Sequence, residues 1–281
     1  MVRLLQQLGY SRIWELPHGK EVSLGRSTQA CCLQMGNDSV LALADSSASM
    51  LNVNDALQGN DPNVTLPLVR SLRQRYRFDI AFLAFGTAGP YPKCYRFDDK
   101  RESMDPWVKE RAMVNNFVQG AIATGARTVV PFAGGFALLD EKLMWMNTAK
   151  STPADALEAL RAKDPNIRGL EMNPGDAWNS QEGIIQVHPA VDWGQRLQLI
   201  RRMQQARGGV LKQIETEERQ GPADLYDLFQ TRLSQNLRNF PFLRRRMNCS
   251  VLFDVKGEPG GKWEVDLRRS SVYFREGDSA D

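Results

Sequence analysis

Residues 78–85 read FDIAFLAF and lead directly into GTAGPYPKCY at 86–95. A continuous apolar run of this length, ended by glycine and proline, is typical of a strand buried on both faces of a sheet. Residues 127–132 (RTVVPF) form a second such run, and residues 106–124 between them have the spacing of an amphipathic helix. Strand, helix and strand in this order predict parallel pairing and an α/β fold.

The flanking segments extend this pattern. Residues 40–44 (VLALA) and 50–53 enclose a short polar turn, which predicts a β-hairpin. Leucine and valine between residues 66 and 72 have helical spacing, and residues 153–162 form another short helix after a Ser-Thr cap. We further expect a strand at 168–172 and one long, charged helix at 193–218.

The last part of the chain changes character. A helix is expected at 223–238, followed by alternating, strand-like segments at 249–256, 262–267 and 271–274. Gly221-Pro222 is expected to end the preceding helical segment. We therefore place a boundary there, which gives a domain at 1–220 and a small α+β module at 221–281.

The composition excludes several classes of protein. The chain has 281 residues, of which 25% are charged and 42% hydrophobic, with a net charge of +3, so a globular core is expected and a disordered chain is not. No run approaches the roughly 20 apolar residues of a membrane span. Four scattered cysteines without a CxxC pattern predict a reduced, cytoplasmic protein. The basic tract from Arg232 to Arg246 lacks an accompanying aromatic motif, so no nucleic-acid partner is predicted.

Histidine is the scarcest of the residues that carry chemistry. Only His18 and His188 are present. Imidazole is the commonest metal ligand and the usual general base near neutral pH. A mechanism that needs several histidines is therefore excluded for this chain alone.

Candidate site residues follow the expected strands. Asp55 ends the segment LNVND at 51–55, where neighbouring amides could orient a metal-binding carboxylate, although on these residues alone an ordinary turn is the better interpretation. Tyr91 and Cys94 lie in the loop after the first apolar run, where ligands of α/β folds collect. A rigid, proline-containing loop is an equally good interpretation of that segment.

The second apolar run ends in a similar way. Gly134 and Gly135 follow residues 127–132 and are themselves followed by Asp140 and by an ending that contains Asn147. Exposed backbone beside acidic side chains suits a ligand. The methionines and the tryptophan at 144–146 are better interpreted as core residues.

Taken in order, LNVND, FDIAFLAFGTAGPYPKCY and RTVVPFAGGF…DEKLMWMN resemble the second half of a metallo-β-lactamase-fold domain. The branch most similar is that of CMP-N-acetylneuraminate hydroxylase and the lactonase-like hydrolases. The resemblance covers residues 10–150 and implies an αββα-type half-domain in which Asp55 is a metal ligand. It places Asp140 where a ligand histidine usually stands, and it implies a substrate pocket lined by Tyr91, Cys94, Gly134, Gly135 and Asn147. The tail after residue 222 is similar to a sterol-carrier-type module, which would be incomplete.

The resemblance implies a divalent metal (zinc, iron or manganese) and a small-molecule substrate whose ester, amide or phosphodiester is attacked by metal-bound water. The family's His-x-His-x-Asp-His motif is absent from the sequence. Two carboxylates alone are too few ligands for a metal site that activates a water molecule. Three interpretations stay open. The chain is a fragment completed by a partner polypeptide, or a degenerate member that acts as a non-catalytic binding or partner subunit, or an unrelated α/β protein.

Overall fold

The computed structural model describes residues 2–36, 38–58, 60–87, 106–220, 224–239, 249–256, 260–269 and 271–275. The chain divides into two compact units, Met1–Gln204 and Gln205–Asp281, and each is described by itself. This division lies earlier in the chain than the boundary near Gly221 that the sequence predicts.

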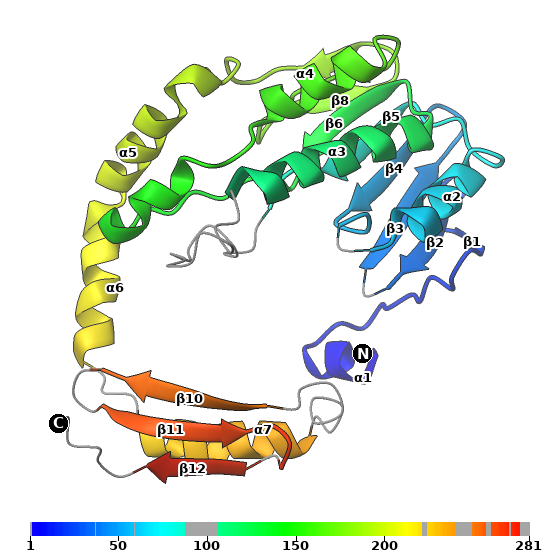
Figure 1. Ribbon diagram of the computed structural model, residues 1–281. Coiled ribbons are helices and arrows are strands. Elements are labelled where there is room, and N and C mark those ends of the chain that lie inside the picture. Colours follow the sequence, from blue (N-terminus) through cyan, green and yellow to red (C-terminus); the bar gives the residue numbers. More distant parts are fainter. Residues whose placement is uncertain are drawn as a thin grey trace. The chain divides into compact units, whose positions relative to one another are not determined.

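The first unit carries most of the secondary structure (Figure 1). In chain order its elements are α1 (Val2–Gln7), β1 (Glu21–Ser23), β2 (Gln29–Met35), β3 (Asp38–Ala44), β4 (Ser49–Asn54), α2 (Pro62–Leu72), β5 (Ile80–Ala84), α3 (Pro106–Thr124), β6 (Thr128–Phe132), the 3₁₀ helix η1 (Glu141–Asn147), α4 (Pro153–Lys163), β7 (Arg168–Gly169), β8 (Ala177–Asn179), β9 (Gly183–Ile185), the 3₁₀ helix η2 (Trp193–Gln195) and α5 (Arg196–Ala206).

A seven-stranded sheet forms the centre of this unit, with the strand order β1-β2-β3-β4-β5-β6-β7. Strands β1 to β4 pair antiparallel, and strands β4 to β7 pair parallel. The hairpin predicted around residue 45 is confirmed as β3 and β4. The two apolar runs are confirmed as parallel neighbours, since Ile80 of β5 lies opposite Thr128 of β6. The fold of this unit is therefore α/β.

Helices α2, α3 and α4 cover one face of this sheet (Figure 1) and share one apolar core with it. Phe117 of α3 and Leu83 of β5 are buried at its centre. Gly120 lets α3 approach closely, because a Cβ atom there would collide with the side chains of Leu57 and Leu83. The helix that the sequence predicts between the two apolar runs thus packs directly over β5.

The opposite face of the sheet has a thinner cover. Ile80, Val130 and Leu170 are buried there beneath Trp178 and Ile184 of the β8–β9 hairpin. Phe132 at the end of β6 is 42% exposed, although its ring contacts that of Phe82 edge-on, with the ring centroids 6.2 Å apart. This face is apolar without being fully enclosed.

One expectation for a helix is wrong in its extent. The long helix predicted at 193–218 is divided into η2, α5 and α6 (Gly208–Gln220), and the helical hydrogen bonding is interrupted at Arg207. Two successive glycines, Gly208 and Gly209, weaken a helix at this point because glycine loses the most backbone entropy on folding. Among the described residues, no helix combines the length and apolar content that crossing a bilayer requires.

The second unit is a small α+β structure. After α6 it contains the π-helix η3 (Asp227–Leu233), α7 (Ser234–Asn239), and the antiparallel strands β10 (Ser250–Val255), β11 (Gly261–Asp266) and β12 (Ser271–Arg275). Trp263 of β11 stacks on Phe229 of η3 with ring centroids 4.9 Å apart. This contact lies in the core that joins the helical layer to the sheet.

The contact between α3 and β5 gives a test of the fold. Leu83→Ala is expected to lower the free energy of unfolding by about 2–5 kcal/mol, because it leaves a cavity under Gly120. Leu8→Ala is the matched control, since Leu8 is 66% exposed, and it is expected to change stability by less than about 0.5 kcal/mol. Urea unfolding followed by circular dichroism measures both. Equal effects of the two substitutions would contradict this packing.

Candidate functional site

Strands β4, β5 and β6 are parallel, so their carboxyl ends lie along one edge of the sheet. Ligands of α/β folds gather at such an edge. Among the described residues, two non-glycine residues have a positive φ. Asn54 (φ 47°) is the last residue of β4, and Ala133 (φ 49°) directly follows β6. Backbone strain of this kind clusters at functional sites. This edge of the sheet is therefore a candidate functional site.

The loops after β5 and β6 touch each other through glycine. A Cβ atom on Gly86 would collide with the carbonyl oxygen of Gly134, and a Cβ atom on Gly134 would collide with the ring of Phe85. Gly134 is therefore required for packing. Gly135, the other glycine of the predicted pair, is exposed, and a Cβ atom there would meet nothing within 4 Å.

Asp55 lies at this edge, directly after β4, with an exposed side chain. Desolvation raises the pKa of its carboxyl group, and the negative charge of Asp38 raises it further. The antiparallel pairing of β3 and β4 brings Asp38 to the same end of the hairpin. Asp140 plays no part in that shift.

Asp140 has a local role. Its side chain caps η1, where Oδ1 accepts a hydrogen bond of 2.8 Å from the backbone N–H of Lys142. Within the described part of the chain, no three histidine, cysteine, aspartate or glutamate side chains gather closely enough to hold a metal ion. The described donor set therefore does not fit the divalent metal that the resemblance implies.

The remaining predicted residues fall into two groups. Asn147 is fully buried, and its amide bonds both backbone groups of Leu138, at 2.9 Å to the N–H and 2.8 Å to the carbonyl. It therefore fixes the loop before η1, which gives it a structural role that the predicted contact with substrate does not explain. Tyr91 and Cys94 lie outside the described residues.

A buried polar network at the same edge was not predicted. Glu110 of α3 is 0% exposed, and its carboxylate accepts hydrogen bonds from the Thr87 hydroxyl at 2.7 Å and from the Ser151 backbone N–H at 2.9 Å. Lys150, 4% exposed, donates from Nζ to the Thr87 carbonyl at 2.9 Å. The network joins the end of β5, the first turns of α3 and the residues before α4.

Two further contacts enclose Lys150. Its ammonium group lies 3.4 Å from the centre of the Phe136 ring, a cation–π contact. Its carbonyl accepts a hydrogen bond of 3.1 Å from Arg196 Nη1. Burial lowers the pKa of Arg196, while the charges of Glu110 and Asp155 raise it. The buried charges are thus surrounded by partners of complementary charge or polarity.

The signal for Glu110 was present in the sequence. Glu110 precedes Phe117 by seven residues and Ala121 by eleven, which puts all three on the same face of a helix. All three side chains are fully buried. A carboxylate on the apolar face of an expected helix is the pattern that indicates a buried polar site.

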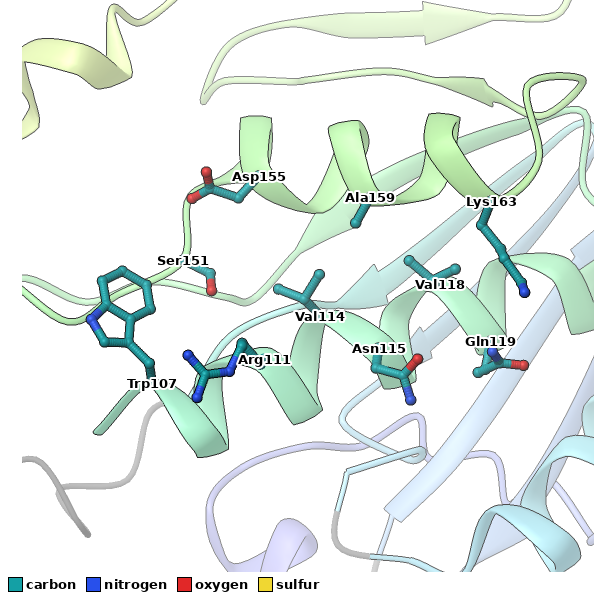
Figure 2. Close-up of a pocket in the computed structure, with 10 residues that line it drawn as sticks. All are labelled: Trp107, Arg111, Val114, Asn115, Val118, Gln119, Ser151, Asp155, Ala159 and Lys163. Atoms are coloured by element: carbon teal, nitrogen blue, oxygen red, sulfur yellow. The ribbon is translucent and has the colours of Figure 1, made fainter. Parts of the chain in front are cut away.

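A groove of about 500 Å³ begins beside this network, between α3 and α4 (Figure 2). Ser151 belongs both to the network and to the wall of the groove. The groove is lined by Trp107, Arg111, Val114, Asn115, Val118, Gln119, Ser151, Asp155, Ala159 and Lys163. Its volume lies within the range of pockets for small molecules, roughly 300–1,000 Å³.

No family model and no curated protein matches this chain. Its function is therefore inferred from the side chains described above.

Replacing the buried carboxylate tests the network. Glu110→Gln is expected to cost about 1–3 kcal/mol, because the hydrogen bonds with Thr87 and Ser151 then lose the negative charge that strengthens them. Glu158→Gln on the exposed side of α4 is the control, with an expected change below about 0.5 kcal/mol. Urea unfolding compares the two. A loss no larger for Glu110→Gln would mean that the network adds no stability.

The Asp38–Asp55 pair predicts a dependence of stability on pH. The folded state raises the pKa of Asp55, so it binds this proton more tightly than the unfolded state, whose carboxyl pKa is about 3.9. The resulting stabilisation is complete below that value and is lost as the pH rises through the raised pKa.

Asp55→Asn is therefore expected to lose less stability than the unmodified protein between pH 4 and pH 7. Asp38→Asn is expected to act in the same direction, and the two substitutions together are expected to be less than additive. Urea unfolding at both pH values measures the effect, with Glu158→Gln as control. Strictly additive effects would show that the carboxylates do not interact.

Proposed function

We propose that this chain is a small-molecule-binding protein, whose α/β unit resembles half of a metallo-β-lactamase-fold domain and lacks the metal-activated water of that family. The observation that carries this proposal is the groove between α3 and α4, which starts at a rigid, buried polar network. A pocket whose side chains are already ordered binds a ligand without the entropic cost of ordering them.

The donor chemistry favours binding over hydrolysis by this chain alone. Hydrolysis of an ester, amide or phosphodiester by the family's route needs several ligands that hold one or two cations. Asp55 has the repelling carboxylate of Asp38 beside it, and Asp140 caps η1. Neither is joined by a third ligand among the described residues.

The position of the groove supports the same function. It opens where Trp107 and Arg111 of α3 lie near Ser151, at the end of the helices closest to the carboxyl edge of the sheet (Figure 2). Val114, Val118 and Ala159 supply apolar surface along its length, and amides and charged groups lie around them. Apolar walls with a few polar groups are the usual composition of a small-molecule site.

A second candidate function is a metal-dependent hydrolase that a partner polypeptide completes. The observation that favours it is the Asp38–Asp55 pair, because a divalent cation would relieve the repulsion between two carboxylates at the carboxyl edge. The partner would supply the missing histidines, and the incompletely covered face of the sheet offers it an apolar surface.

Filling the groove tests the binding function. Ala159 points from α4 toward α3 in Figure 2, so Ala159→Phe is expected to occupy the groove. Saturation-transfer NMR with a set of small organic compounds should detect binders of the unmodified chain that lose at least tenfold in affinity with Ala159→Phe. Ala162→Phe, the same change at an exposed position of α4, is the matched control. Compounds that bind all three proteins equally would contradict the proposal.

A metal ion that the chain holds without a partner would favour the second candidate. We expect the purified chain to retain less than about 0.1 equivalent of zinc, iron or manganese, and added metal to leave the melting temperatures of the unmodified protein and of Asp55→Ala equal. Plasma mass spectrometry and thermal unfolding measure these quantities. One equivalent of metal that is lost in Asp55→Ala would favour the hydrolase over the binding protein.

A further inference from the structure

The charges around the groove are unevenly distributed. At the end near the sheet edge, both Arg111 and Asp155 line the groove, and the Asp155 carboxylate accepts hydrogen bonds from the backbone N–H and the hydroxyl of Thr152. Arg196 is close enough to Glu110 and Asp155 for both to affect its pKa. Positive and negative groups are therefore mixed at this end.

The other end of the groove is positive. Lys163 is the last residue of α4, its side chain is exposed, and it extends toward Gln119 of α3 (Figure 2). Among the described residues Lys163 has no hydrogen-bond or ion-pair partner. Gln119 can add an amide donor. An anionic group at this end would meet a cation and a neutral donor.

The stretch between the two ends is apolar and of limited length. Asp155 and Lys163 are eight residues apart on α4, which corresponds to about 12 Å along the helix axis. Val114, Val118 and Ala159 lie between these ends, and Trp107, 38% exposed, lies at the far end from Lys163 (Figure 2). An aromatic ring is a suitable partner for the tryptophan.

We infer that the groove binds an aromatic anion of about two fused or linked rings, with its rings on Val114, Val118 and Trp107 and its carboxylate or sulfonate at Lys163. This inference rests on the proposed function, since it names the ligand class of the same groove. The charge at Lys163 selects anions over neutral molecules of the same shape.

Two fluorescent probes that share one ring system test the inference. Anilinonaphthalene sulfonate is anionic, and phenylnaphthylamine is the same molecule without the sulfonate. Both are titrated into the full chain and into Lys163→Gln, Ala159→Phe and Lys20→Gln. Lys20 is an exposed lysine before β1, at the opposite edge of the sheet from β6 and β7, and serves as the matched control.

We expect Lys163→Gln to weaken binding of the sulfonate by roughly three- to fivefold and that of the neutral probe by less than about twofold, since the ion pair between the exposed ammonium group and the sulfonate is lost. Lys20→Gln should change neither affinity, and Ala159→Phe should abolish both. If Ala159→Phe abolishes both but Lys163→Gln alters neither, the anion preference is refuted and the binding groove stands. If Ala159→Phe alters neither, the groove and the proposed function fail together. Lys163 is exposed, so its variants keep the charge test valid even if Ala159→Phe does not fold.

Discussion

Parallel pairing of β4, β5, β6 and β7 is the constraint on which the first unit depends. Parallel neighbours need a crossover that returns the chain across the sheet, and such crossovers are almost always right-handed. The strand order advances in one direction from β4 to β7, so right-handed crossovers place α2, α3 and α4 on the same face. That arrangement sets α3 beside α4 and creates the groove, and among the described residues the β8–β9 hairpin covers the opposite face.

The elements defined by local pattern could be predicted from the sequence. The helix expected at 106–124 is α3 with the same limits, and both apolar runs are central strands. The expected strand at 168–172 is reduced to Arg168–Gly169, because strand pairing to β6 continues for those residues alone. The break at Arg207 follows from the glycines after it, which charge and apolar spacing alone do not reveal. Local patterns describe single elements, whereas lengths and breaks depend on the neighbours.

The sequence predicts where the candidate site lies, but not which side chains meet there. The position of Asp55 after a strand predicts its place at the carboxyl edge, and the structure agrees. Its charged neighbour is Asp38, since strand pairing across the hairpin decides which carboxylates meet. Gly134 and Asn147, which the resemblance places at the substrate pocket, also have structural contacts: Gly134 packs closely against Phe85, and Asn147 hydrogen-bonds the backbone of Leu138. Glu110 lay on the apolar face of an expected helix, so a wheel of α3 would have identified it.

The network around Glu110 has a consequence for motion. The carboxylate accepts hydrogen bonds from Thr87 after β5 and from Ser151 before α4, so breaking one of them alone leaves a buried charge without one of its partners, which costs free energy. Neither connection gains from separating by itself. The start of α3, the end of β5 and the start of α4 are thus expected to behave as one cooperative unit in native-state hydrogen exchange, with similar protection of their amides. The mouth of the groove would accordingly open in a single cooperative step, and its three segments would not move independently.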